Sequence, residues 1–76
     1  MSGSLPIISG REAVSAFEQV GFLLVPGRGK GSHMVMAKTD FAAILTVPDH
    51  RELKRGLLRA LIRKAGMSVE EFVSLL

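Results

Sequence analysis

The chain has 76 residues, 47% of them hydrophobic, and no cysteine. This length holds one small domain and excludes a second. Without disulfides or a cysteine-bound metal, the core must come from apolar packing, which is compatible with a reducing cytoplasm. The apolar runs are far shorter than the roughly 18 residues of a spanning helix, and residues 1–8 lack the pattern of a signal peptide. We therefore expect a cytoplasmic protein with no membrane partner.

The net charge of +3 hides an uneven distribution of charge along the chain. Residues 27–38 carry +3 and residues 51–64 carry +5, whereas the rest of the chain carries −5. Charge separated in this way suits a polyanion such as nucleic acid, or an acidic protein partner. An ordinary solvated surface is the alternative that charge alone leaves open.

The first predicted element is a helix over residues 10–20. Ser9 and Glu12 fit the capping box, in which each side chain accepts a hydrogen bond from the other residue's backbone N–H. Apolar residues then recur at spacings of three and four, as on the buried face of a helix. Residues 1–8 are expected to be a lead outside the fold, native or left over from cloning, so the domain is placed at residues 9–76.

Three short apolar runs rich in β-forming residues come next. The connections between them are short enough for hairpins, which predicts an antiparallel meander. Side chains alternate between the faces of a strand, so His33 lies on one face of the middle run, and Met34 and Met36 lie on the face that supplies core contacts. The runs span residues 22–25, 32–37 and 43–47.

A basic helix is expected after the third strand, because Asp49 and Glu52 again have capping-box spacing. On a helical wheel one stripe is aliphatic and packs, while the opposite stripe offers guanidinium groups. Gly56 costs about 1 kcal/mol relative to alanine, which points to close packing or to a closely approaching ligand. The aliphatic stripe is Leu53, Leu57, Leu61 and Ala65, and the basic one is Arg51, Arg55, Arg59 and Arg63.

A further capping box, Ser68 with Glu71, predicts a short final helix over residues 69–75. The order of elements predicts an α+β domain, α-β-β-β-α with a short extra C-terminal helix. Its three-stranded antiparallel sheet is expected to carry the helices on one face. This arrangement resembles the double-stranded-RNA-binding domain.

Composition removes most catalytic templates, since the chain has two histidines and no cysteine. Asp49, His50 and Glu52 are the only cluster of metal-binding residue types, and helix capping explains that cluster better. The glycine-rich residues 27–31 lack the spacing of a nucleotide-binding P-loop. We therefore expect no metal and no cofactor.

The glycine-rich stretch nevertheless holds two cations, Arg28 and Lys30, whose neighbouring backbone amides could approach phosphates. A basic hairpin without a ligand is the alternative. His33 follows, and an imidazole exchanges protons near neutrality. Beside a phosphodiester, a group that transfers a proton typically accelerates cleavage by about 10²- to 10⁴-fold. RNA is the natural substrate because its own 2′-hydroxyl is the nucleophile, although a lone strand histidine can equally be structural.

Several short motifs, taken together in order and spacing, resemble the HicA toxin family over residues 6–76. The most specific combination is a Gly-Ser-His strand, then Val-Pro-x-His, then a Lys-x-Gly helix. The resemblance implies a small bacterial toxin with a double-stranded-RNA-binding-like fold, which cleaves messenger RNA and is neutralised by a HicB antitoxin. The residues concerned are Gly31-Ser32-His33, Val47-Pro48 with His50, Lys54 with Gly56, and Ala65-Gly66-Met67.

The resemblance further implies that His33 is the catalytic residue, flanked by Ser32. His50 matches the histidine of Val-Pro-x-His, but a place in the first turn of the basic helix favours a structural role. Leu57 stands where the family commonly has threonine, and we expect it to join the core. Phe41 lies in the second hairpin, where it either stacks on a base or an antitoxin or folds back onto the sheet.

The leading hypothesis is a metal-independent endoribonuclease toxin with His33 as general acid or base. Its partners are messenger RNA and a HicB-like antitoxin. A non-catalytic RNA-binding module and a pure protein-interaction domain remain open, since both would use the same basic surfaces. The expected RNA contacts are Arg28, Lys30, Ser32, Arg51, Arg55 and Arg59.

Overall fold

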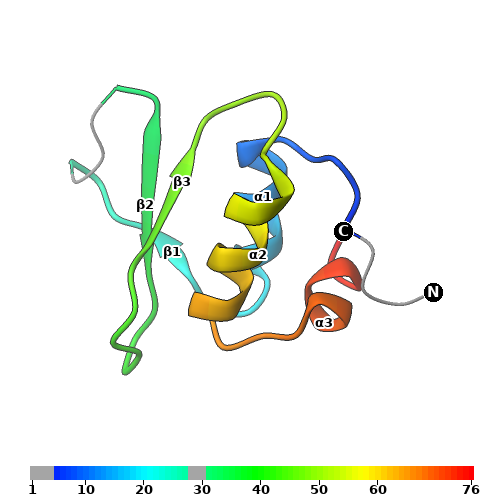
Figure 1. Cartoon of the computed structure of the whole chain (residues 1–76). Helices are drawn as coiled ribbons and strands as arrows, with labels where there is room; N and C mark the ends of the chain where they lie inside the picture. Colours follow the sequence, from blue (N-terminus) through cyan, green and yellow to red (C-terminus); the bar gives the residue numbers. More distant parts are fainter. Residues whose placement is uncertain (1–4, 28–30) are drawn as a thin grey trace.

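The computed structural model describes residues 5–27 and 31–76. Within them, a three-stranded antiparallel sheet carries the helices on one face, here called the inner face, and the opposite face is the outer face (Figure 1). The predicted fold class is confirmed. The elements are α1 (Gly10–Glu18), β1 (Leu23–Leu24), β2 (His33–Ala37), β3 (Leu45–Pro48), α2 (Arg55–Lys64) and α3 (Val69–Val73).

The central strand β2 pairs with both β1 and β3 in antiparallel register. Met36 is fully buried in the core and Met34 packs against the same core, as the predicted alternation requires. His33 is exposed and lies opposite Pro48. Because side chains alternate along a strand, His33 lies on the outer face.

The core is centred on three phenylalanines from different parts of the chain. The ring of Phe17 in α1 meets the ring of Phe22 edge-on, with centroids 6.0 Å apart, and lies 5.0 Å from the ring of Phe72 in α3. All three rings are fully buried. Such pairs contribute about 0.5–1.5 kcal/mol beyond the buried area, so they tie α3 to the domain although it has only five residues.

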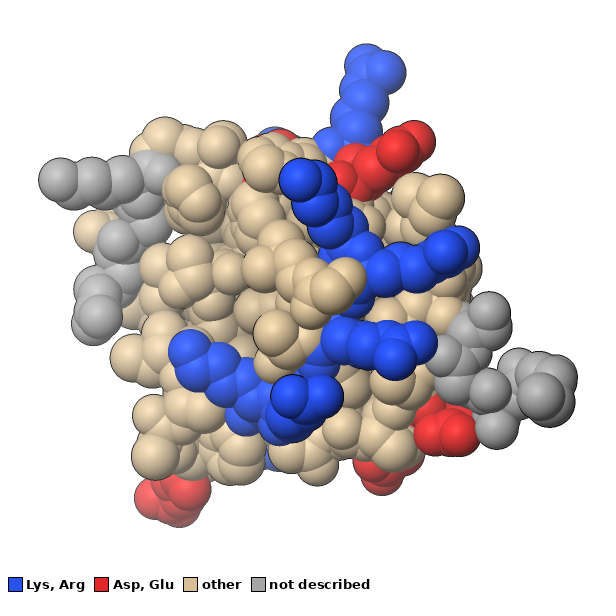
Figure 2. Space-filling view, in the orientation of Figure 1, with Lys and Arg blue, Asp and Glu red and all other residues tan. Residues whose placement is uncertain are grey.

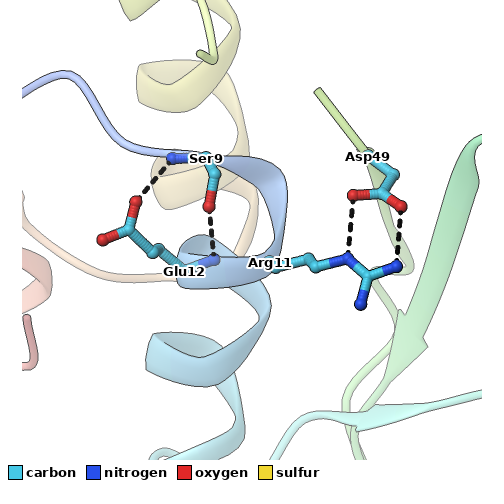
Figure 3. A network of polar contacts seen from close by, with 4 residues as sticks. All are labelled: Ser9, Arg11, Glu12 and Asp49. Atoms are coloured by element: carbon cyan, nitrogen blue, oxygen red, sulfur yellow. Dashed lines mark hydrogen bonds and ion pairs between the residues drawn. The ribbon is translucent and has the colours of Figure 1, made fainter. Parts of the chain in front are cut away.

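Two of the predicted capping boxes are present. The hydroxyl of Ser9 accepts from the N–H of Glu12 at 3.0 Å, and the Glu12 carboxylate accepts from the N–H of Ser9 at 2.9 Å (Figure 3). Ser68 and Glu71 make the same pair of bonds at the start of α3. Each box closes within four residues, which is why the local sequence is enough to predict it.

The capping box predicted at Asp49 is wrong, because α2 begins only at Arg55. The Asp49 carboxylate instead accepts two hydrogen bonds of 3.2 Å from the guanidinium of Arg11 in α1 (Figure 3). A carboxylate engaged in this way does not cap a helix start. Residues 49–54 form a non-helical connection, here called the β3–α2 connection, in which the N–H groups of Asp49 and Leu53 bond to the carbonyls of Ser32 and Ile8.

Leu5 and Ile8 belong to the core, contrary to the expectation that residues 1–8 lie outside the fold. Their exposed fractions are 2% and 6%. The carbonyl of Ile8 accepts from the N–H of Leu53 at 2.8 Å, and the carbonyl of Leu5 accepts from Nε of Arg55 at 3.2 Å. Two apolar residues without periodicity carry no sequence signal, so this tertiary pairing could not be foreseen.

The buried face of α2 also differs from the predicted stripe. Leu57, expected in the core, is 38% exposed. The other three residues of the predicted stripe are buried, with exposed fractions of 3% for Leu53, 5% for Leu61 and 7% for Ala65, so the prediction is wrong at Leu57 alone. Around Gly56, apart from its chain neighbours and the backbone of the same helix, no described atom lies within 4 Å of where a Cβ would stand, so packing against other elements does not require glycine there. The side chains that α2 buries are Leu58, Leu61 and Ile62.

Candidate functional site

His33 opens β2 at the end of the sheet where β3 ends. Beyond its partner Pro48, the ladder continues through one further bond, from the N–H of Asp49 to the carbonyl of Ser32. Regular pairing with β3 and Asp49 therefore fixes the backbone before and after the histidine in the chain. The imidazole is presented from the outer face of the sheet.

The chain that leaves β3 is held against the start of α1. The N–H of Gly10 donates to the carbonyl of His50 at 2.8 Å. A Cβ at Gly10 would overlap the carbonyl oxygen of Pro48, so only glycine permits this approach. Two carbonyls, two residues apart, thus lie against one glycine.

His50 lies in the β3–α2 connection, so the prediction that places it in the first turn of a helix is wrong. Its side chain is exposed. The contact that joins this position to α1 is made by the backbone carbonyl, which accepts from Gly10. The bond itself does not use the imidazole.

The expected arginine stripe is divided between different settings. Arg51 is exposed in the β3–α2 connection, Arg55 holds the carbonyl of Leu5 at the first turn of α2, and Arg59 is exposed one turn further along. Lysine and arginine side chains gather over the face on which α2 lies (Figures 1 and 2). Since α2 packs against the inner face and His33 lies on the outer face, Arg55 and Arg59 lie on the other side of the sheet from the histidine.

Arg28 and Lys30 lie outside the described residues, so their predicted phosphate contacts remain predictions. The glycines on either side, Gly27 and Gly31, have φ angles of 76° and 58°. These angles favour glycine over other residues. Ser32, which follows, is exposed, and its carbonyl closes the ladder described above.

Phe41 lies in the turn between β2 and β3, at the opposite end of the sheet from His33. Its ring meets that of Phe22 edge-on, with centroids 5.6 Å apart, and also approaches Gly66. The ammonium of Lys38 lies 5.8 Å from the Phe41 centroid. Of the two alternatives for Phe41, the structure supports the one in which it folds back, although 36% of it stays exposed. The length of β2, about 13 Å, separates it from His33.

Metal-binding residue types do not cluster in the described part of the chain: there, no group of three or more His, Cys, Asp or Glu could hold a metal ion. Asp49 is engaged by Arg11, and this hydrogen bond, reinforced by the carboxylate charge, raises the pKa of the guanidinium. No helix among the described residues is long and apolar enough to cross a membrane.

Residues 10–67 match the family model described as HicA toxin of bacterial toxin-antitoxin. The chain belongs to the HicA toxin family. A solved toxin-antitoxin complex from Streptococcus pneumoniae contains a chain that is 30% identical to this HicA-family chain and superposes with a TM-score of 0.70. The match covers 79% of this chain and 98% of that one. A comparison with curated proteins finds no match. The family resemblance of the motifs is thereby confirmed.

Two residues that position the site in this HicA-family chain were not predicted, Gly10 and Arg11. Their partners, Pro48 and Asp49, lie 38 residues further along the chain, beyond the reach of local patterns. One signal was available for Arg11. A cation in the first turn of a helix is unfavourable beside the helix dipole, so it indicates a carboxylate partner elsewhere.

Proposed function

We propose that this HicA-family chain is a toxin that cleaves messenger RNA as a metal-independent endoribonuclease. The observation that carries the proposal is the placement of His33, exposed on the outer face and fixed by strand pairing on both sides. It lies two residues after the basic glycine-rich residues 27–31. An imidazole held beside RNA needs no metal, since RNA carries its own nucleophile.

The proposed reaction is a transphosphorylation within the RNA. The 2′-hydroxyl loses its proton, its oxygen attacks the adjacent phosphorus, and the bond from phosphorus to the 5′ oxygen breaks. The departing 5′ oxygen gains a proton. The products are a 2′,3′-cyclic phosphate, which can hydrolyse to a 3′ phosphate, and a free 5′ hydroxyl. His33 serves one of the two proton transfers.

Basic side chains are proposed to hold the RNA backbone. An RNA that reaches both His33 and α2 must pass around the end of the sheet, where Arg51 lies in the β3–α2 connection. Arg55 and Arg59 then continue the contact along α2. Substituting one arginine that binds a phosphate should reduce the salt dependence of binding by about 0.7 in the log–log slope for single-stranded RNA.

The test is cleavage of RNA by the purified protein in EDTA, with the product ends identified by mass spectrometry. We expect a cyclic or 3′ phosphate and a 5′ hydroxyl, and no cleavage by His33→Ala. Loss of activity in EDTA would contradict the metal-independent mechanism. Binding of intact RNA by both proteins without cleavage would identify a non-catalytic RNA-binding module instead. Failure of both to bind RNA at physiological salt would identify a protein-interaction domain.

We also propose a HicB-like antitoxin as the protein partner, docked on the outer face that carries His33. The support is the similar chain found in a toxin-antitoxin complex, together with an apolar surface beside the histidine strand. Leu23 is 65% and Ile44 37% exposed, and Leu23 lines a shallow hollow of about 380 Å³. The fitting partner surface is apolar and rimmed with carboxylates, because residues 27–38 are basic.

Leu23→Asp should weaken binding of a purified HicB-like protein while leaving RNA cleavage intact, because Leu23 lies on the far strand from β3. Leu76→Asp is the matched control, since Leu76 is 51% exposed at the other end of the chain. Binding can be measured by titration calorimetry. Equal affinities of the two variants would place the antitoxin elsewhere.

A further inference from the structure

The chain stays extended for two residues beyond β3. The carbonyl oxygens of Pro48 and His50 both lie against Gly10. Carbonyls that point the same way at every second residue are the repeat of an extended strand. The N–H of Asp49, between them, still bonds to the carbonyl of Ser32 across the ladder. The side chains therefore continue to alternate between the two faces of the sheet, as in β3, through His50.

This alternation assigns a side to each residue. The Asp49 side chain points toward α1, where it meets Arg11 (Figure 3). Its neighbours Pro48 and His50 accordingly project to the other side. Pro48 is the register partner of His33, and register partners share a face. His33 and His50 thus lie on the same face as diagonal neighbours, a relation that separates backbone positions by about 7–8 Å.

We propose that His50 is the second proton-transfer group of the reaction and acts with His33 on one phosphodiester. The inference rests on the proposed ribonuclease function. The reaction has two proton transfers, and diagonal neighbours on one face can reach different oxygens of the same phosphate. One imidazole takes the proton of the 2′-hydroxyl, and the other, in its protonated form, gives a proton to the departing 5′ oxygen. Solvent water then restores both protonation states.

The surroundings of His50 agree with this role. The fold needs its backbone carbonyl, which accepts from Gly10, while its imidazole is exposed. The adjacent carboxylate, Asp49, is turned away and engaged by Arg11. The imidazole of His50 is therefore available for contact with a substrate.

The test compares His33→Ala, His50→Ala and the wild type on two versions of one short RNA. In the second version, sulfur replaces the bridging 5′ oxygen at the cleaved linkage. On ordinary RNA we expect each variant to be slower by about 10²- to 10⁴-fold. A thiolate leaves without being protonated, so the sulfur substrate should restore cleavage by whichever variant lacks the general acid. A purely structural role for His50 would not produce such a rescue.

Control measurements distinguish failure of the role proposed for His50 from failure of the proposed ribonuclease function. Glu52→Gln, an exposed change in the same connection, should cleave like the wild type, and thermal unfolding should be unaltered in all variants. If His50→Ala cleaves ordinary RNA at the wild-type rate while His33→Ala is inactive, the role of His50 is refuted and the proposed function stands. Absence of rescue in both variants refutes the paired mechanism. Absence of cleavage by the wild type refutes the proposed function itself.

Discussion

The two ends of the sheet present different side chains. At the end where β2 begins, backbone hydrogen bonds fix the chain, such as that from Gly10 to the carbonyl of His50, and the imidazoles of His33 and His50 are exposed. At the opposite end a side chain holds the turn, because the ring of Phe41 packs on Phe22. Exposed side chains suited to proton transfer are thus concentrated at one end.

We therefore expect one end of this short sheet to determine catalytic activity and the other end to contribute to folding stability. Substitutions at the histidine end should change activity and leave the free energy of unfolding alone. Substitutions at the phenylalanine end should do the reverse. The contact at Gly10 connects the two properties, since Gly10 is buried and its N–H also holds the carbonyl of His50.

The largest effect is expected for His33→Ala. Single-turnover RNA cleavage should fall about 10²- to 10⁴-fold because one proton transfer no longer has its side chain. The free energy of unfolding should change by no more than about 0.5 kcal/mol, as for other exposed positions. Urea denaturation checks the second value. A loss of stability comparable to the loss of activity would show that the two ends do not differ as described.

Gly10→Ala should lower both the catalytic activity and the free energy of unfolding. The added methyl overlaps the carbonyl of Pro48, and overpacking of this kind costs about 1–3 kcal/mol. The connection that holds His50 must shift, so cleavage by the folded protein should fall as well. Urea denaturation and single-turnover kinetics measure the two effects. Ser15→Ala, an exposed change in the same helix, is the control, and equal stability of the two variants would refute the close contact.

Phe41→Ala should lower stability by about 1–2 kcal/mol. The value lies below the usual 3–5 kcal/mol for a buried phenylalanine because 36% of this residue is exposed. Cleavage by the folded protein should be unchanged, and Phe41→Leu should recover part of the stability. If folded Phe41→Ala bound RNA more weakly in a binding titration, the aromatic ring would be a base contact rather than a turn anchor.

The smallest effect is expected for Gly56→Ala in the first turn of α2. Space for the methyl is open, so stability should rise by up to about 1 kcal/mol. Thermal unfolding measures the change. A fall in stability would contradict the open surroundings. A rise accompanied by weaker RNA binding would show that the glycine serves a closely approaching substrate.

The sequence predicted those features whose causes are local. The capping boxes at Ser9 and Ser68 depend on residues three positions away, and the outward side of His33 follows from simple alternation. The start of α2 was mispredicted because Arg11, far away in sequence, takes the Asp49 carboxylate. His50 is placed on the wrong element by the same expected helix start, since it lies in the β3–α2 connection.

On the proposed mechanism, the histidine end of the sheet cleaves RNA through the substrate's own 2′-hydroxyl. The most direct measurement uses an RNA oligonucleotide with one 2′-deoxynucleotide on the 5′ side of the cleaved linkage, incubated with the wild-type protein in EDTA. We predict that cleavage at this linkage stops while the all-RNA control is cut there. Continued cleavage at the deoxy linkage, leaving a 5′ phosphate, would contradict the account.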